Sequence, residues 1–362
     1  ARAKTDLADQ PATQSRMLAT LGRAYNNLGL LDEARTAFES SLPAIQKAGP
    51  DGAEAMVVLA ATYHREGSLD KALATVKRAE AMLGPDLTEK VDVRAAAAVT
   101  EGRIHTATTQ VKPGVAAFDR ALAFYRSMES PPPASVAAVL NNRGILLSDD
   151  GQFEAAETSL NESLRIYQRA LGAGHLSTGK AWFALAQNSF LAGKLARAEE
   201  QVAMALRIER AVLDSTNTTL ADTLSMQGQI QQGLGKLAAA ERSLREALAI
   251  YKKAYPRGHY LIGIADVYLA LIESERGATG AALATLDDAK RNYDASYGKI
   301  HPNHGDLLVN RATVLARAGR LVEARRDCNA GIAILKETMG ADASFTKSMA
   351  ATCAGLGAKK KA

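Results

Sequence analysis

The chain has 362 residues, of which 47% are hydrophobic, 23% charged and 5% aromatic, and its formal net charge is +5. Its 28 glycines and 10 prolines are too few for a collagen-like or disordered chain, and its two cysteines are too few for a disulfide-rich scaffold. No apolar stretch reaches the roughly 18–20 residues that cross a membrane. The length alone is typical of two or three globular domains.

The net positive charge is concentrated at the end of the sequence. Residues 347–362 contain four lysines and no acidic residue, so they carry four of the five net positive charges. A nucleic-acid interface needs Lys and Arg clustered along one face of a domain. We therefore expect a solvated basic tail, no nucleic-acid partner and no membrane insertion by this segment.

An internal repeat organises the sequence. Seven segments begin with a glycine that is followed by an alanine-rich amphipathic pattern: Gly29, Gly67, Gly151, Gly193, Gly235, Gly277 and Gly319. The last five of these glycines are spaced by 42 residues. The gap of 84 residues before them contains one more repeat, with Thr109 at its turn. The sequence therefore contains eight repeats, and the first interval is 38 residues.

Three columns of residues support this register. Five residues after each turn there is a small residue: Ala34, Ala72, Gly114, Ala156, Ala198, Ala240, Ala282 and Ala324. Four residues further on there is an apolar residue: Phe38, Val76, Phe118, Leu160, Val202, Leu244, Leu286 and Cys328. Seven residues before each turn there is a second small residue: Gly22, Ala60, Gly102, Gly144, Ala186, Gly228, Ala270 and Ala312.

The pattern predicts a pair of helices in each repeat. Apolar residues recur every three or four positions before the turn, as in Leu18, Leu21 and Tyr25, and this spacing indicates a first helix. A second helix follows the turn, where glycine tolerates the positive φ that ends the first helix. The small columns mark the places where paired helices approach closely, and a larger side chain there would cost about 1–3 kcal/mol. The predicted fold class is all-α.

These residues resemble the tetratricopeptide repeat (TPR), whose small residues and inter-helix turn occupy the same places. The period of 42 resembles the kinesin-light-chain type, because LGAGH (171–175), YPRGH (255–259) and YGKIHP (297–302) match its linker and LNNRG (140–144) matches its first helix. Asn217 takes the linker histidine's place in one repeat. The resemblance implies a right-handed superhelical solenoid of antiparallel helix pairs. Departures stand at Thr109, Gly114, Glu80 and Lys290.

The chain can be divided on this register. Residues 1–14 are expected to lead into or cap the first helix, and residues 347–362 to form a capping helix with a lysine tail. The eight repeats between them are 15–52, 53–94, 95–136, 137–178, 179–220, 221–262, 263–304 and 305–346. The segment SPPPAS (130–135) predicts a stiff loop or a bend between repeats, and we favour the loop.

No catalytic motif is found, so we expect no enzyme, no cofactor and no metal. In HPNHGD (301–306) the linker pattern explains His301, and a metal site is not predicted. Asp149 and Asp150 are expected in a solvated turn, and Trp182 in the core. For the cysteines we favour reduced, buried side chains, although a disulfide between the neighbouring helices that carry them stays an alternative. An unrecognised enzymatic site and a self-associating scaffold are the remaining alternatives.

The resemblance implies that first helices line a concave surface that holds an extended peptide or a partner protein. Transferring the family's positions gives these candidate binding residues: Arg16, Arg23, Asn26, Asn27, His64, Arg65, Arg103, Asn141, Asn142, Lys180, Gln187, Gln229 and Gln232. Asn and Gln side chains pair with a peptide backbone, and Arg with a carboxylate. The partner is therefore expected to carry an acidic or C-terminal carboxylate feature. The complete carboxylate clamp of chaperone-binding TPR domains is not evident.

Residues 7–34 also resemble the TPR regions that follow the kinase domain in bacterial serine/threonine kinases. This resemblance implies a part of a larger bacterial signalling protein, fused to a kinase or another signalling domain. The start at Ala1, without a secretory signal pattern, is consistent with such a segment. The location stays open between the cytoplasm and, for a membrane kinase, the periplasm. The alternative function is a peptide-sensing regulatory domain whose superhelix pitch changes when its ligand binds.

Overall fold

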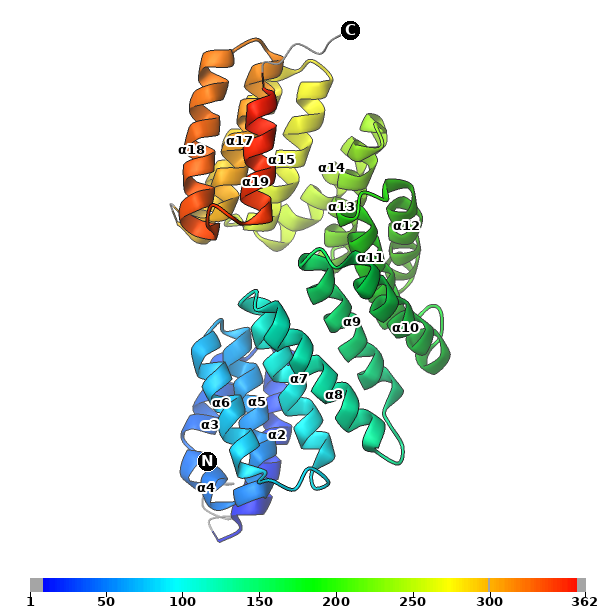
Figure 1. Cartoon of the computed structure of the whole chain (residues 1–362), viewed down its shortest axis with the longest axis vertical. Helices are drawn as coiled ribbons and strands as arrows, with labels where there is room; N and C mark the ends of the chain where they lie inside the picture. Colours follow the sequence, from blue (N-terminus) through cyan, green and yellow to red (C-terminus); the bar gives the residue numbers. More distant parts are fainter. Residues whose placement is uncertain (1–8, 299, 357–362) are drawn as a thin grey trace. The chain divides into compact units, whose positions relative to one another are not determined.

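The computed structural model describes residues 9–298 and 300–356. The chain divides into two compact parts, an N-terminal half (residues 1–192) and a C-terminal half (residues 193–362). Every regular element in the described ranges is a helix, and Figure 1 shows the helices stacked side by side within each half. The predicted all-α solenoid of helix pairs is confirmed.

The N-terminal half begins with a first helix and alternates from there. Its elements are α2 (Pro11–Leu28), α3 (Leu31–Glu39), α4 (Leu42–Lys47), the 3₁₀ turn η1 (Gly49–Gly52), α5 (Ala53–Arg65), α6 (Leu69–Met82), α7 (Val91–Ala107), α8 (Val111–Ser127), α9 (Pro133–Asp149), α10 (Phe153–Leu171) and α11 (Leu176–Leu191). The first helices α2, α5, α7, α9 and α11 each contact the next one in the series. They therefore form one continuous layer of this half.

The C-terminal half has the same construction. Its elements are α12 (Leu195–Val212), α13 (Thr218–Gly233), α14 (Leu237–Ala254), α15 (Tyr260–Glu275), α16 (Thr279–Tyr297), α17 (Pro302–Arg317), α18 (Leu321–Met339) and α19 (Ser344–Gly355). The first helices α13, α15, α17 and α19 are again in contact with one another in order. No described helix is long and apolar enough to span a bilayer.

The turns between paired helices fall where the glycine spacing predicts them. Gly29 has φ +76° and Gly151 has φ +78°, both in the left-handed region that glycine adopts without strain. Thr109, which replaces glycine in the third repeat, keeps the same turn with φ +54°. A β-branched residue is uncommon in this region. The turn geometry is thus retained even where the sequence disfavours it.

The first repeat departs from the expected continuous second helix. Its helix ends at Glu39 in α3 and resumes at Leu42 in α4. Pro43 lies in the first turn of α4, where its missing N–H and its ring are tolerated. In the interior of a longer helix the same ring would clash with the carbonyl of residue 39. Proline therefore explains the break.

The small columns are where paired helices touch. Phe38 is 1% exposed, and a Cβ placed on Gly22 would lie only 2.1 Å from its ring. In the second repeat the receiving residue is Ala60 and the inserted one is the smaller Val76, both fully buried in one cluster. Glycine and alanine are therefore needed because the second helix inserts a side chain at this position.

The linker histidines act as helix N-caps. Nδ1 of His259 accepts the backbone N–H of Leu261 at 3.3 Å, and Nδ1 of His301 accepts that of Asn303 at 3.2 Å. Asn217, in the same place of another repeat, accepts a backbone N–H with its Oδ1 at 2.9 Å. An N-cap side chain must be an acceptor. This requirement explains why neutral histidine and asparagine exchange here.

The two cysteines form a disulfide, contrary to the favoured expectation of reduced thiols. Cys328 on α18 and Cys353 on α19 are bonded, with their Cα atoms 5.8 Å apart. α19 starts at Ser344 rather than near residue 347, and Thr346 is its one buried residue among the side chains described. The covalent bond therefore holds a helix that buries little surface of its own.

Two smaller expectations can also be placed. The proline segment forms a loop, because α8 ends at Ser127 and α9 begins at Pro133, whose ring suits the first turn of a helix. Trp182 is partly buried and packs against the core cluster of its half, as expected. The lysines near the C-terminus lie outside the described residues, apart from Lys347.

Replacing Gly144 with alanine should destabilise the N-terminal half. The added Cβ would lie 2.6 Å from Leu160, so we expect a loss of about 1–3 kcal/mol in chemical denaturation. The second change Leu160→Val should recover part of that loss, because alanine and valine form this pair in the second repeat. Gly280→Ala, in a helix with open space around it, is the control and should not destabilise. Equal effects of the two alanines would refute the packing argument.

Replacing His259 and His301 with asparagine should flatten the dependence of stability on pH. Burial lowers the pKa of both histidines in the folded chain, so the unfolded chain binds more protons. Their contribution is present above the unfolded pKa of about 6.5 and is lost as pH falls through the lower folded values. Urea denaturation between pH 7 and pH 5 should therefore show a smaller loss in the double variant, which caps as Asn217 does. An unchanged slope would contradict capping by neutral imidazole.

The substitution Cys353→Ser should release α19. Closing a loop of 25 residues stabilises a fold by about 3 kcal/mol, and α19 buries little else. We expect faster amide hydrogen exchange in α19 and unchanged exchange in α13 and α14. Dithiothreitol should reproduce the effect in the wild type and add nothing in the variant. Undiminished protection of α19 in the variant would show that packing alone holds the helix.

Candidate functional site

The first helices of the N-terminal half enclose a pocket of about 340 Å³. Five of the residues expected to bind a partner line it: Arg23, Asn26, Asn27, Arg65 and Arg103. They come from α2, α5 and α7, which lie next to one another. The structure thus brings together most of the basic and amide residues expected near the start of the groove.

The floor of the pocket is apolar. Val57, Val58 and Ala61 of α5 and Val93 and Ala96 of α7 line it. Successive turns of a helix place residues three, four and seven apart on one face, so α5 contributes a short stripe of such side chains. An apolar floor bordered by a few polar groups is the usual composition of a site that binds an organic ligand.

Arg23 is paired with an acid that the sequence did not single out. Its Nη1 lies 2.6 Å from Oε1 of Glu54, and both side chains are more than one-third exposed. An exposed pair of this kind contributes only about 0–1 kcal/mol, so a ligand carboxylate can compete for the guanidinium. Glu54 and Asp92 also line the pocket. Glu54 precedes Ala61 by seven residues, and this helical spacing is the signal that would have placed it.

Asn26 holds two helices together. It is buried, and its Nδ2 donates to the hydroxyl of Thr62 on α5 at 3.0 Å. Arg65 donates to the backbone carbonyl of Asn26. The carboxamide was expected to pair with a bound peptide, but the structure already gives it a partner across α2 and α5. We therefore assign Asn26 to positioning the wall of the pocket.

Arg103 is the arginine of this pocket with neither an acidic partner nor a hydrogen bond from its guanidinium among the described residues. Surrounding protein lowers its pKa, because desolvation disfavours the charged form. Burial, and then the charge of Arg103, lower the pKa of His64, which favours the neutral imidazole at neutral pH. Arg103 is nevertheless exposed, so the pocket presents one accessible guanidinium whose donors are unused by acids.

The other expected residues lie outside this pocket. Arg16 is exposed on α2, and His64 lies partly buried on α5. Asn141 and Asn142 lie partly buried on α9, and Lys180 and Gln187 lie on α11. Oδ1 of Asn141 is buried without a hydrogen-bond partner. Gln229 and Gln232 lie on α13, in the C-terminal half, where Gln232 donates to Glu275 at 3.4 Å. The predicted binding residues are thus distributed over both halves, and only those in the pocket of α2, α5 and α7 form a described cluster.

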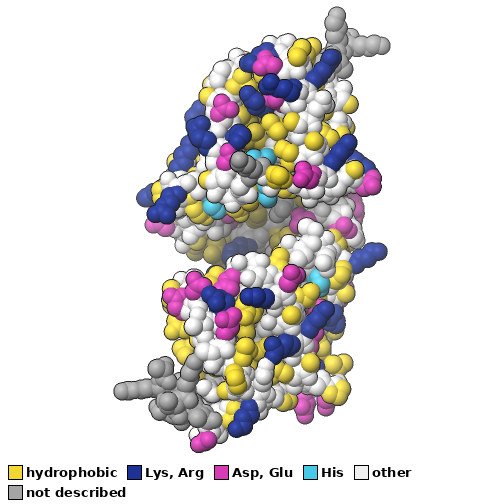
Figure 2. All heavy atoms as spheres, turned by 90° about the vertical axis from the view of Figure 1, so that its left-hand side faces the viewer, with side chains coloured by type: hydrophobic (Ala, Val, Ile, Leu, Met, Phe, Trp, Pro, Cys, Tyr) yellow, Lys and Arg dark blue, Asp and Glu magenta, His cyan; other side chains and the backbone are white. Residues whose placement is uncertain are grey.

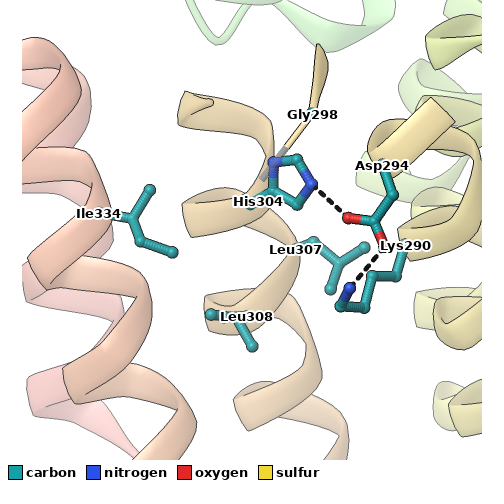
Figure 3. A pocket seen from close by; sticks show the side chains of 7 residues that line it. All are labelled: Lys290, Asp294, Gly298, His304, Leu307, Leu308 and Ile334. Atoms are coloured by element: carbon teal, nitrogen blue, oxygen red, sulfur yellow. Dashed lines mark hydrogen bonds and ion pairs between the residues drawn. The ribbon is translucent and has the colours of Figure 1, made fainter. Parts of the chain in front are cut away.

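A larger pocket, of about 550 Å³, lies in the C-terminal half between α16, α17 and α18 (Figure 3). Figure 3 shows Asp294 between His304 and Lys290, with Leu307, Leu308 and Ile334 around them. Asp294 accepts from Lys290 at 2.6 Å and lies 3.0 Å from Nε2 of His304. The polar groups of this pocket therefore largely satisfy one another.

The histidines of HPNHGD have separate structural roles. His301 caps α17 and stacks on Tyr297 with ring centroids 3.5 Å apart, whereas His304 faces Asp294. Asp306 instead accepts from the side chain of Asn310 at 3.0 Å. Over residues 9–298 and 300–356, no three His, Cys, Asp or Glu side chains are grouped as metal ligands.

The charges of both halves are mixed. Figure 2 shows Lys and Arg side chains interspersed with Asp and Glu on the visible face of each half. Many of them are paired, as in Arg35, which contacts Asp32 at 2.6 Å and Glu66 at 3.1 Å. Opposite charges paired this closely have little net field at a distance, and salt screens the remainder beyond about one Debye length, roughly 8–10 Å. Asp149 is the last residue of α9 and is exposed, as expected for a residue at a turn. Neighbouring protein groups partly desolvate its carboxylate, which raises its pKa.

Comparison with known proteins agrees with this architecture. Family models described as tetratricopeptide repeat match residues 13–83 and 135–211, residues 218–260 and residues 306–326, together more than half of the chain. A search of curated proteins finds no match.

Solved structures of similar fold include the apo form of RapI, which is 15% identical over 78% of this chain and 97% of its own, with a TM-score of 0.62. A Rap protein complexed with competence and sporulation factor is 12% identical over 95% and 98%, with a TM-score of 0.58. A tetratricopeptide repeat protein from Parabacteroides merdae is 13% identical over 83% and 98%, with a TM-score of 0.54. At these identities the likeness is one of fold.

Proposed function

The chain belongs to the tetratricopeptide repeat family, and we propose that it is a non-catalytic interaction module whose first helices bind a peptide or partner protein. The repeat fold supplies a layer of neighbouring first helices whose exposed faces differ from repeat to repeat. Extended binding surfaces of this kind are how repeat proteins recognise other chains.

The observation that carries the proposal is Arg103 in the pocket of α2, α5 and α7. Arg103 is exposed and paired with no acid, so its guanidinium donors are available to an anionic ligand. The apolar floor beside it suits an aliphatic or aromatic side chain. We infer that the ligand is a peptide segment with a carboxylate, either an acidic side chain or a C-terminus, next to an apolar residue.

The remaining predicted residues extend this proposal. Asn142, Lys180 and Gln187 lie on first helices that follow α7 in the same layer, so an extended peptide that begins in the pocket meets them next. Amide side chains both donate and accept, which suits the backbone of such a peptide. Gln229 and Gln232 are proposed to serve in the same way on α13.

Peptide sensing by a change of superhelix pitch is the second candidate. A Rap protein of similar fold has been solved in complex with competence and sporulation factor, which favours a signalling ligand for the fold. We further propose that the chain works in an oxidising compartment, because disulfides such as Cys328–Cys353 persist there. A periplasmic sensing segment of a bacterial signalling protein fits both points.

The substitution Arg103→Ala should weaken peptide binding. A displayed library of peptides with free carboxyl termini would supply ligands for the full chain, and fluorescence anisotropy would measure them. We expect a loss of at least about tenfold, about 1.4 kcal/mol, since a charged hydrogen bond is removed. The same loss is expected when a peptide that binds through its C-terminus is amidated.

The control is Arg78→Ala, which removes the same charge from an exposed position on α6, outside the pocket. It should leave affinity unchanged, and thermal melting of both variants should match the wild type. Equal effects of Arg78→Ala and Arg103→Ala, or a library that yields no ligand, would reject the pocket as the binding site.

A further inference from the structure

One column of the repeats contains a single charged residue. Four positions before the small residue of the first helix the chain has Leu18, Met56, Ala98, Leu140, Trp182, Leu224, Asp266 and Leu308. Seven of these eight residues are apolar. Six of these seven are buried or packed against core clusters, and Leu308 is partly buried, so an apolar residue is what this position requires. Asp266 therefore departs from the packing rule of its own repeat.

The Asp266 carboxylate is buried and unsatisfied. The residue is 3% exposed, and its Oδ2 has no hydrogen-bond partner. No ion pair or hydrogen bond to Asp266 occurs within the described chain. A buried carboxylate without a donor is costly, and a leucine in its place would avoid that cost. A residue that breaks a local packing rule without internal compensation indicates a functional role.

Asp266 lines a pocket that can supply the missing partner. The pocket measures about 350 Å³ and lies between the second helices α14 and α16 above α15. Its apolar wall consists of Leu248, Ala249 and Leu269. This volume lies at the lower end of the range for small-ligand sites, about 300–1,000 Å³.

The other acids of this pocket already have partners. Glu273 accepts from Thr285 at 2.8 Å and lies 3.7 Å from Arg245, and Arg245 is also 2.9 Å from Glu241. Asp288 pairs with Arg291. Among the acids lining the described pocket, Asp266 is the one left without a donor.

Lys252 is an internal candidate for a counter-ion. It lines the same pocket and its charge acts on Asp266, yet the two side chains form no ion pair. Lys252 is exposed at the end of α14, where water solvates its ammonium group. The carboxylate therefore keeps an acceptor oxygen that Lys252 does not occupy.

The equivalent place in the next repeat has a pocket in which the acid is paired with other residues of the chain. There Leu308 stands in the position of Asp266 and Asp294 in that of Lys252, and the acid is paired with Lys290 and His304 (Figure 3). Charges in that pocket are satisfied internally. In its own pocket, Asp266 has no such partner among the described residues.

We propose that the Asp266 pocket binds a cationic nitrogen group, an ammonium or guanidinium, carried on a short apolar stem. The cation supplies both the hydrogen bonds and the charge that the buried carboxylate lacks, and Leu248 and Leu269 enclose the stem. The site is separate from the pocket of Arg103, which is built from first helices alone. Its ligand is either a free small amine or a Lys or Arg side chain of a bound protein.

The test uses the full chain, with agmatine as the free cation and acetyl-Gly-Arg-Gly-amide as the side-chain probe. Isothermal titration would compare the wild type with Asp266→Leu, which restores the residue of the column, and with Asp266→Asn. Both variants should lose at least about tenfold in affinity. Asp287→Asn, which removes an exposed charge from α16 outside the pocket, should bind as the wild type does. Binding of agmatine or of the peptide alone identifies the source of the cation.

A change at Lys252 separates a ligand site from an internal ion pair. If the pocket is a ligand site, Lys252→Met removes a positive charge that repels the cationic ligand, so the ligand binds more tightly. The melting temperature of the unliganded chain then stays unchanged. Asp266→Leu should raise the melting temperature of the unliganded chain, because a buried charge is replaced by the apolar residue of the column. Failure of both probes to bind at millimolar concentration, or equal binding by Asp266→Leu, overturns the proposal. The proposal is also overturned if Lys252→Met destabilises the chain and this effect disappears in the Asp266→Leu background, because the two residues would then form an internal ion pair.

The affinity for the cation should also decrease as the pH is lowered. Burial raises the pKa of Asp266 to about 6, so the carboxylate that binds the cation is lost as pH falls through that value. The charged groups that face it are Lys252 from α14, Glu273 from its own helix and Arg291 from α16. Retention of full affinity at pH 5 would show that the charge of Asp266 is not used. These results are independent of Arg103→Ala, which tests the other pocket.

Discussion

The close approach of the two helices in each repeat is the contact on which the rest of the structure depends. A glycine or alanine of the first helix receives a buried side chain of the second, as Gly22 receives Phe38 and Ala60 lies with Val76. Interiors of proteins are packed as densely as crystals, so this contact permits little variation in volume. Repeating it along the chain produces the same helix pair again and again, which accounts for the few aromatic residues and the many alanines.

Because these columns carry the packing, the opposite face of each first helix is free to vary. The position directly after the small residue is Arg23 in the first repeat, Ala61 in the second and Arg103 in the third. These three residues meet in one pocket although they are separated by some forty residues in sequence. The scaffold therefore brings unlike side chains into one site without any change in backbone geometry. That is why a solenoid can present a specific surface while its repeats stay alike.

The sequence predicted the helix pairs and their turns because both follow from local spacing, even at Thr109, where glycine is absent. Five of the residues that it singled out line one pocket. It did not predict that Asn26 would be held by Thr62, or that Arg23 would meet Glu54, since those partners belong to the next repeat and depend on the stacking distance. The preference for reduced cysteines was wrong for the same reason, because two helices must bring the cysteines within bonding distance. Local sequence patterns specify which face of a helix a residue lies on. The residue in the next repeat that it contacts can be identified only from the three-dimensional structure.

A repeat offers a comparison that a single domain lacks, since each position has seven counterparts in the same chain. At the position of Asp266 the counterparts are apolar, so the physical requirement of the site is known independently of that residue. The carboxylate is buried where leucine fits, and none of the residues that the structure describes donates to its Oδ2. By contrast, Asn217 replaces a linker histidine and preserves its cap, and Thr109 replaces a glycine and preserves its turn. Asn217 and Thr109 keep the structural role of the residues they replace, so the fold explains them. Asp266 opposes the packing role of its position, which is evidence that it serves a function other than folding.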